Sequence, residues 1–181
     1  MKISKNFGSK DLIIETGKIA KQANGSVMVT YGETVLLATV TCSKFPSDNR
    51  SFFPLSVEYR EKFYSSGRIP GGFFKREARP AEHEIIASRL TDRPLRPLFP
   101  SDFFHETQVL INVLSYDGSI NPDILGTIGA STALSISNIP WDGPVASVRI
   151  GRDEDGKFII NPNKEELATS QAIAATSAVG G

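Results

Sequence analysis

The chain has 181 residues, of which 40% are hydrophobic and 22% charged, the balance of an ordinary globular protein. This length suits one domain around a single core. Its 20 basic residues are matched by 20 acidic ones. The zero net charge excludes a protein that coats nucleic acid through an overall positive charge, so any contact with nucleic acid must be local.

The sequence predicts a cytoplasmic protein without membrane contact. Its one cysteine, Cys42, cannot form an internal disulfide and lies in an apolar run, which indicates a reducing compartment. Residues 1–7 lack the apolar core of a signal peptide, and the uncharged stretch Ile124–Ile139 is too short to span a bilayer.

The first part of the chain is typical of antiparallel strands. Short β-rich runs alternate with turn pairs from Leu12 to Cys42, which predicts a meander. The almost continuously apolar run Val35–Val40 predicts a central strand that is covered on both faces. In contrast, the alternation of Leu55, Val57 and Tyr59 with polar residues predicts a half-exposed strand.

Helices and further strands are predicted in the second part. They are a helix over Ala81–Leu90 that begins after Pro80 and stops before Pro94, a strand over Val109–Leu114, a buried helix over Ile124–Ile139, and a hairpin of Val145–Ile150 with Phe158–Ile160. Small residues such as Gly126 and Gly129 let the buried helix lie close against a sheet. Residues 171–181 show no periodicity and predict a frayed tail, which leaves 1–170 as the folded part.

Residues 65–74 break the strand pattern with three glycines and a proline and predict a projecting loop. The adjacent rings of Phe73 and Phe74 occupy its tip, where both can offer flat surfaces to unpaired bases. Lys75 and Arg76 follow and would meet the phosphates. Such a loop would bind RNA without reading its sequence. The alternative is that the Phe pair anchors a subunit interface or folds back onto the core.

Four arginines beyond the loop extend this candidate surface. They are Arg79, Arg89, Arg93 and Arg96. A guanidinium group suits phosphate because its planar fork meets two oxygens at once. Glu82, Glu84 and Asp92 are close enough in sequence to engage the same arginines in structural ion pairs, so both roles stay open.

The sequence offers no catalytic centre of a known pattern. His83 and His105 are isolated and are interpreted as surface or packing residues, and no Ser-His-Asp order, Cys-x-x-Cys pair or Walker loop occurs. The acidic turn Asp153–Asp155 is interpreted as solvated rather than as a metal site, because three adjacent carboxylates cannot all aim at one ion. We therefore predict no catalytic residue and no metal ligand in this segment.

Two motifs carry a resemblance to a known family. Gly-Gly-Phe-Phe-Lys-Arg-Glu at 71–77 and Ser-Arg-Leu-Thr-Asp-Arg-Pro-Leu-Arg-Pro-Leu-Phe-Pro at 88–100 resemble the signature of the polynucleotide phosphorylases. Gly-Glu-Thr at 32–34 with the apolar run that follows, and Asn-Pro-Asp at 121–123, resemble the same family. The likeness extends over residues 1–170.

The resemblance implies an α/β (α+β) fold: an RNase PH-like core, ribosomal protein S5 domain 2-like, with a mixed sheet packed against helices. It implies a phosphorolytic 3′-to-5′ exoribonuclease (polyribonucleotide nucleotidyltransferase) acting in mRNA degradation, assembled as a homotrimeric ring with a channel for single-stranded RNA. Phe73, Phe74, Lys75 and Arg76 would line the channel constriction. Inorganic phosphate would be the co-substrate, Mg²⁺ would be bound by a second core absent here, and other RNA-degradation proteins would be partners.

The chain departs from the family pattern at the turn Asp117–Asp123. It has Ser119 but no run of hydroxyl groups for a phosphate. We therefore expect this segment to supply RNA capture and trimer assembly rather than catalysis, as part of a truncated or frameshifted product or of a longer protein. The alternative functions are a structural or assembly module and an inactive remnant without RNA-degrading activity.

Overall fold

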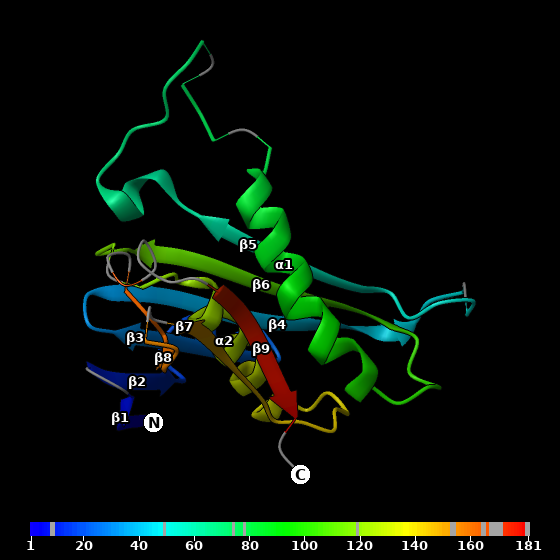
Figure 1. The fold of residues 1–181 in the computed structure, drawn as a ribbon. Helices are drawn as coiled ribbons and strands as arrows, with labels where there is room; N and C mark the ends of the chain where they lie inside the picture. Colours follow the sequence, from blue (N-terminus) through cyan, green and yellow to red (C-terminus); the bar gives the residue numbers. More distant parts are fainter. Residues whose placement is uncertain are drawn as a thin grey trace.

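A computed structural model describes residues 1–7, 10–48, 50–73, 75–77, 79–118, 120–152, 155–163 and 166, and the backbone of 172–179. It shows an α/β fold with a six-stranded sheet, two helices and a smaller sheet (Figure 1). Over the described residues, no helix combines the length and the apolar character needed to cross a bilayer.

The large sheet is mixed, as predicted. Its strands are β1 (Lys2–Phe7), β2 (Lys10–Thr16), β3 (Gly25–Tyr31), β4 (Thr34–Pro46), β5 (Leu55–Glu61) and β6 (His105–Ser115). They lie in the order β1-β2-β3-β4-β6-β5, antiparallel throughout except for the parallel pair β5 and β6. The predicted meander therefore forms β2, β3 and β4, and β1 adds an edge strand that the sequence did not predict.

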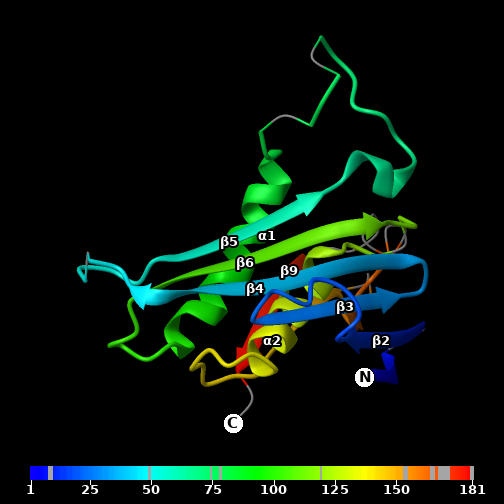
Figure 2. The same cartoon turned by 180° about the vertical axis from the view of Figure 1, so that it is seen from behind.

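Both helices, α1 (Glu82–Leu95) and α2 (Asp123–Ser135), cover the same face of the large sheet (Figures 1 and 2). Along β4, alternate side chains Leu36, Ala38 and Val40 are fully buried under this layer, whereas the residues between them are only half-buried. The prediction that this strand is covered on both faces was wrong. An apolar run cannot by itself distinguish two covered faces from one.

Helix α2 is buried, as predicted for the uncharged stretch after Asp123, although it ends at Ser135 rather than Ile139, and it approaches the sheet closely at a glycine. A Cβ atom at Gly129 would stand 3.1 Å from Cβ of Ala38 and 3.2 Å from side-chain carbons of Leu36 and Val29. These separations are tighter than ordinary van der Waals contact, so any larger side chain would require the helix or the sheet to shift.

Helix α1 extends further than predicted. It continues through Pro94 to Leu95 and passes into a 3-10 turn, η2 (Arg96–Leu98). A proline removes one N–H and crowds the carbonyl four residues before it. Here the Arg96 amide still donates to Asp92 O, so the chain keeps its helical path across the proline.

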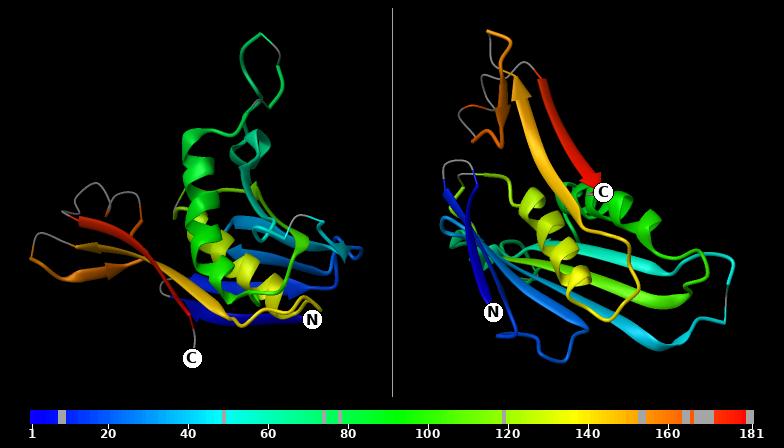
Figure 3. Two further views of the ribbon diagram at one scale, coloured as in Figure 1. Left: turned by 90° about the vertical axis from the view of Figure 1, so that its right-hand side faces the viewer. Right: turned by 90° about the horizontal axis from the view of Figure 1, so that it is seen from below.

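A smaller sheet lies on the helix side of the molecule, where β7 packs against α2 (Figure 3). Its strands are β7 (Val145–Arg152), β8 (Phe158–Ile160) and β9 (Ala172–Val179), in the order β8-β7-β9. The predicted hairpin forms β7 and β8. The structure differs from the expected frayed tail, because β9 pairs with β7 from Val145 opposite Val179 to Arg152 opposite Ala172.

Strand β5 forms one edge of the large sheet, and side chains of α1 and of the turn η2 that follows it bond to its outward backbone groups. Ser88 Oγ accepts a hydrogen bond from the Tyr59 amide at 3.0 Å. At the start of the strand, Arg96 donates to the Leu55 carbonyl, also at 3.0 Å. The helix therefore satisfies an edge that sheet pairing leaves open.

Candidate nucleic-acid interface

The predicted loop projects beyond the sheet and the helices, between the 3-10 turn η1 (Phe63–Ser66) and α1 (Figure 1). Phe73 is 95% exposed near its tip. Phe74 lies outside the described residues. Lys75 and Arg76 are exposed, and within the described residues neither forms a hydrogen bond or an ion pair. The loop thus presents one flat ring and two cations to solvent, the groups that suit a single-stranded nucleic acid.

Left-handed backbone shapes this tip. Gly72 has φ of +84°, a conformation that glycine adopts without strain, and Lys75 has φ of +48°, which is uncommon for a residue with a side chain. These two positions lie on either side of the exposed Phe73 in the sequence.

A carboxylate from the end of the loop binds the beginning of the loop. Glu77 Oε2 accepts a hydrogen bond from Lys62 Nζ at 2.9 Å, and Oε1 accepts one from the Phe63 amide at 3.1 Å. The hydrogen bond from Lys62 is the main cause that lowers the pKa of Glu77, with the Phe63 amide adding to it against a smaller desolvation effect. Glu77 therefore ties the two ends of the loop together as a charged group.

A second carboxylate, Glu84 in the first turn of α1, is buried behind the loop. Its Oε1 accepts from the Glu61 amide and its Oε2 from the Ala81 amide, both at 2.7 Å. Arg60 lies 3.9 Å away, at the outer limit of an ion pair. Glu84 thus joins the end of β5 to the start of α1.

The predicted arginine row divides in the structure. Arg79, Arg89 and Arg93 are exposed, and within the described part of the chain none of them forms an ion pair. Arg89 lines an open groove of about 410 Å³ between α1 and the edge strand β5, together with Arg60 and Pro80. These cations remain available to a phosphate backbone.

Arg96 takes the structural one of the two roles that its sequence leaves open. Its guanidinium group binds both carboxylate oxygens of Asp92 and donates to the carbonyls of Phe53 and Leu55, each at 3.0 Å. Four of its five N–H groups are thereby used inside the chain. Its predicted contact with RNA has therefore less support from the structure than that of the other arginines.

The two histidines make local contacts, as predicted. His105 stacks on Phe103 with ring centres 5.1 Å apart, and its Nδ1 lies 2.9 Å from the Ser43 carbonyl. His83 Nε2 lies 3.3 Å from Glu61, whose other oxygen accepts from the Tyr59 hydroxyl at 2.9 Å. Burial, the main cause, raises the pKa of Tyr59 far above its usual range, and the charge of Glu61 adds to the effect.

In the turn 117–123, two carboxylates pair with cations of the chain itself. Asp117 accepts from Lys10 Nζ at 3.1 Å and from the Thr34 hydroxyl at 3.0 Å. At the start of α2, Asp123 pairs with Arg149 at 2.6 Å, while burial raises the pKa of its carboxyl group against that attraction. Ser119 lies outside the described residues. The carboxylates already use these two cations, so the turn presents no open anion site built from them.

Metal binding by this segment is also not supported by the geometry. Asp153 and Glu154 of the acidic turn lie outside the described residues. Within the residues that are described, no three His, Cys, Asp or Glu side chains come together in a way that could hold a metal ion. The donor set of the described part therefore does not fit Mg²⁺.

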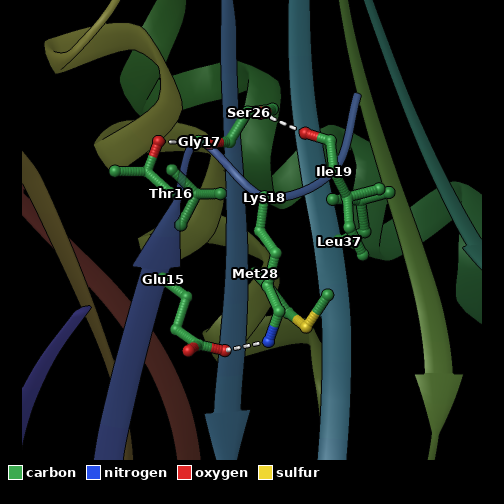
Figure 4. A pocket seen from close by; sticks show the side chains of 9 residues that line it. Glu15, Thr16, Gly17, Lys18, Ile19, Ser26, Met28 and Leu37 are labelled. Carbon is green, nitrogen blue, oxygen red and sulfur yellow. Dashed lines mark hydrogen bonds and ion pairs between the residues drawn. The ribbon is translucent and has the colours of Figure 1, made fainter. Parts of the chain in front are cut away.

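A small hollow lies beside the connection between β2 and β3 (Figure 4). Ser26 Oγ donates to the Ile19 carbonyl at 2.7 Å, and Thr16 Oγ1 donates to the Ser26 carbonyl at 2.8 Å. Its accessible volume of about 10 Å³ is enough for one water at most. It is too small for a nucleotide or a phosphate ion.

The sequence indicated the loop and the exposed cations but not the two carboxylates at the loop base. Glu84 was considered only as a partner for nearby arginines. Its spacing of three residues after Ala81 is a signal for a side chain that caps the helix start. No local pattern reveals that Glu84 also binds the amide of Glu61, 23 residues earlier.

Comparison with known proteins agrees with this architecture. Residues 8–140 match the model of the 3′ exoribonuclease family, domain 1 (RNase PH). The polyribonucleotide nucleotidyltransferase of Acidiphilium cryptum (strain JF-5) is 53% identical over 166 residues, covering 92% of this chain and 23% of that protein. The polyribonucleotide nucleotidyltransferase of Brucella ovis is 50% identical over 179 residues, covering 97% of this chain and 25% of that protein. The chain thus spans about a quarter of the length of these relatives.

Two solved structures share the fold at 17% sequence identity. Rice (Oryza sativa) Rrp46 superposes with a TM-score of 0.71, covering 92% of this chain and 74% of that one. The Archaeoglobus fulgidus exosome with RNA bound to the active site gives a TM-score of 0.70, covering 99% of this chain and 79% of that one. These structures show the shared fold, and the match of residues 8–140 to the family model shows that the chain belongs to the 3′ exoribonuclease family, domain 1 (RNase PH).

Proposed function

We propose that this chain captures single-stranded RNA for a phosphorolytic 3′-to-5′ exoribonuclease acting in mRNA degradation in the cytoplasm. The observation that carries the proposal is the projecting loop with Phe73 95% exposed and with Lys75 and Arg76 unpaired among the described residues. Its relatives are polyribonucleotide nucleotidyltransferases, and one neighbour in fold is an exosome with bound RNA. Both support an RNA substrate.

The proposed interface consists of a stacking element and a phosphate-binding element. Phe73, with Phe74 beside it in sequence, stacks on bases, and the cations bind the backbone. They are Lys75, Arg76, Arg79, Arg89 and Arg93. Stacking on a ring contributes about 1 to 3 kcal/mol per base without regard to sequence, and the phosphate contacts add a salt-sensitive attraction. This division fits an enzyme that degrades RNA of any sequence.

In the complete enzyme, inorganic phosphate would attack the terminal phosphodiester, break the bond from phosphorus to the 3′ oxygen and release a nucleoside diphosphate. Mg²⁺ would supply charge neutralisation in a second core of the same protein. The described residues of this segment offer no metal cluster, and the cations of the comparable turn are already paired. We therefore assign this segment substrate capture and no chemical step.

A binding experiment tests the proposal. Fluorescence anisotropy with labelled oligo(A) should show binding by the chain, and Phe73→Ala should weaken it about 5- to 150-fold, the loss of one stacked base. Ile69→Ala is a matched control, because Ile69 is an 87% exposed apolar residue of the same loop without an aromatic face. Equal affinities for the wild type and Phe73→Ala would contradict RNA capture by this loop.

One observation favours assembly as a second function. Helix α1 exposes three large apolar side chains, Ile85, Ile86 and Leu90, at 45%, 56% and 38%. An exposed apolar patch is typical of a protein contact, so we propose that α1 also contributes to a homotrimer. Sedimentation of the wild type and of Ile86→Gln tests this, and an unchanged mass distribution would count against assembly through α1.

A further inference from the structure

We propose that Glu77 and Glu84 are positioning residues: together they clamp the base of the projecting loop and so hold Phe73, Lys75 and Arg76 in place for RNA. The inference rests on the proposed RNA capture and identifies what orients it. Neither carboxylate needs to touch RNA in this role. Each acts through the backbone at the two ends of the loop.

The amino-acid composition of the loop does little to fix its conformation. Between the two carboxylate contacts the chain contains Pro70 and three glycines, and its described side chains at the tip face solvent. The entering end is fixed independently, since the Tyr116 amide donates to the Ser65 carbonyl at 2.9 Å and the Arg68 amide donates to the Phe63 carbonyl at 3.0 Å. Among the described residues, the returning end is tied to the entering end by Glu77 and Glu84.

Glu84 does more than cap a helix. One oxygen accepts from the Ala81 amide, the usual contact of a glutamate at the third helical position. The other accepts from the Glu61 amide, at the last residue of β5. Only a carboxylate supplies two acceptor oxygens here, because an amide would turn an NH₂ donor towards one of the two N–H groups. The buried pair of 2.7 Å contacts therefore requires glutamate chemistry.

Glu77 provides the outer half of the clamp. Its contacts with Lys62 and with the Phe63 amide lie just after β5, at the start of η1, where the chain leads into the loop. Glu84 binds one residue before Lys62, at Glu61. Consecutive residues 61–63 are thus bound by two carboxylates that come from the returning chain.

This arrangement lowers the entropic cost of binding. A loop that is already ordered loses less conformational freedom when RNA binds, so more of the stacking energy appears as affinity. Loosening the clamp should weaken RNA binding without removing any group that contacts RNA. It should also open the loop to proteases, whether or not RNA is present.

The test compares Glu84→Gln and Glu77→Gln with Glu82→Gln in the whole chain. Glu82 lies in the same first helical turn as Glu84 but is exposed, and it forms no ion pair with the described residues. It therefore controls for the lost charge near the helix start. Two quantities are measured: the rate of trypsin cleavage after Arg68, Lys75 and Arg76, and the Kd for labelled oligo(A). Thermal melting verifies that each variant is folded.

We expect each clamp variant to be cleaved about tenfold faster within the loop and to bind oligo(A) several-fold more weakly, since a charged hydrogen bond is lost in each. Glu82→Gln should match the wild type in both. If Glu84→Gln melts early, Glu77→Gln at the surface decides alone. Wild-type cleavage and wild-type Kd in both clamp variants would overturn the inference, and so would faster cleavage with an unchanged Kd.

A double substitution separates this inference from the proposed function. If Glu84 acts through the loop, Glu84→Gln should cost less RNA affinity in the Phe73→Ala background than in the wild type, because only its effect through Lys75 and Arg76 remains. Fully additive losses of affinity would mean that Glu84 does not affect RNA binding through the loop. If Phe73→Ala alone leaves the Kd for oligo(A) unchanged, the proposed RNA capture fails. If Phe73→Ala weakens binding but the clamp variants bind normally, only the clamp inference fails.

Discussion

Arg96 and Asp92, one helical turn apart, bind each other through two hydrogen bonds, from Nε to Oδ2 at 3.1 Å and from Nη2 to Oδ1 at 2.9 Å. The same guanidinium group donates to the carbonyls of Phe53 and Leu55. It therefore fastens the end of α1 to the segment that begins the edge strand β5. Of the two roles that the sequence left open for Arg96, the structure thus shows the ion pair, within the frame that carries the proposed RNA-binding surface.

Substitution of this arginine should affect stability. Arg96→Ala leaves the Leu55 carbonyl without its side-chain donor, while the Phe53 carbonyl keeps the Leu55 amide at 2.9 Å, and we expect the free energy of unfolding to fall by about 2 kcal/mol. Urea unfolding measures the change. Arg93→Ala, on the exposed side of the same helix, is the control and should change it by less than about 0.5 kcal/mol. Similar losses in both variants would contradict the structural role of Arg96.

The loop cations should appear in the salt dependence of RNA binding. Each phosphate contact on a single strand contributes about 0.7 to the slope of log K against log salt concentration, so Lys75→Gln and Arg76→Gln should each reduce the slope by roughly that amount. Anisotropy titrations with oligo(A) at several salt concentrations measure it. Lys5→Gln, on β1 at the opposite edge of the sheet, should leave the slope unchanged. A slope equal to the wild type in both loop variants would rule out phosphate contact there.

The clamp should respond to acid through Glu77. Its pKa is lowered in the folded protein, mainly by the hydrogen bond from Lys62. A lowered carboxyl pKa gives a stabilisation that is present above the unfolded value, near 4.5, and is lost as the pH falls through the folded value. The amide resonance of Phe63 should therefore shift with a midpoint below 4.5 in an NMR titration. In Glu77→Gln that shift should disappear, and its persistence would mean that another group titrates.

The contact between the helices offers a further test, at the buried hydroxyls of Thr91 and Thr127, which lie 3.0 Å apart. Thr91→Val keeps the shape but removes one partner, and we expect a loss of about 1 kcal/mol in unfolding free energy. Replacing both threonines by valine should cost less than the sum of the single losses, because no hydroxyl is then left unpaired. Additive losses in chemical unfolding would show that the two hydroxyls do not interact.

Features set by local chemistry were predictable from the sequence. The glycines and proline around residue 70 indicated the loop, and the uncharged stretch after Asp123 indicated a buried helix close to the sheet. Contacts between distant residues were not. The carbonyls bound by Arg96 lie about 40 residues earlier in the chain, and strand β9 forms along β7 although its sequence has no periodicity. The carboxylate clamp belongs to the same class, because its partners meet only after β5 and α1 have packed.

The attachment of α1 to β5 has a consequence for the whole molecule when it is heated. When Ser88 and Arg96 separate from β5, the Tyr59 N–H and the Leu55 C=O lose their hydrogen-bond partners. An open strand edge of this kind is a template for another chain. Detachment of this one helix would therefore convert the folded protein into a species that can add strands from its neighbours. Irreversible aggregation should begin at the temperature at which α1 separates, before the rest of the sheet unfolds.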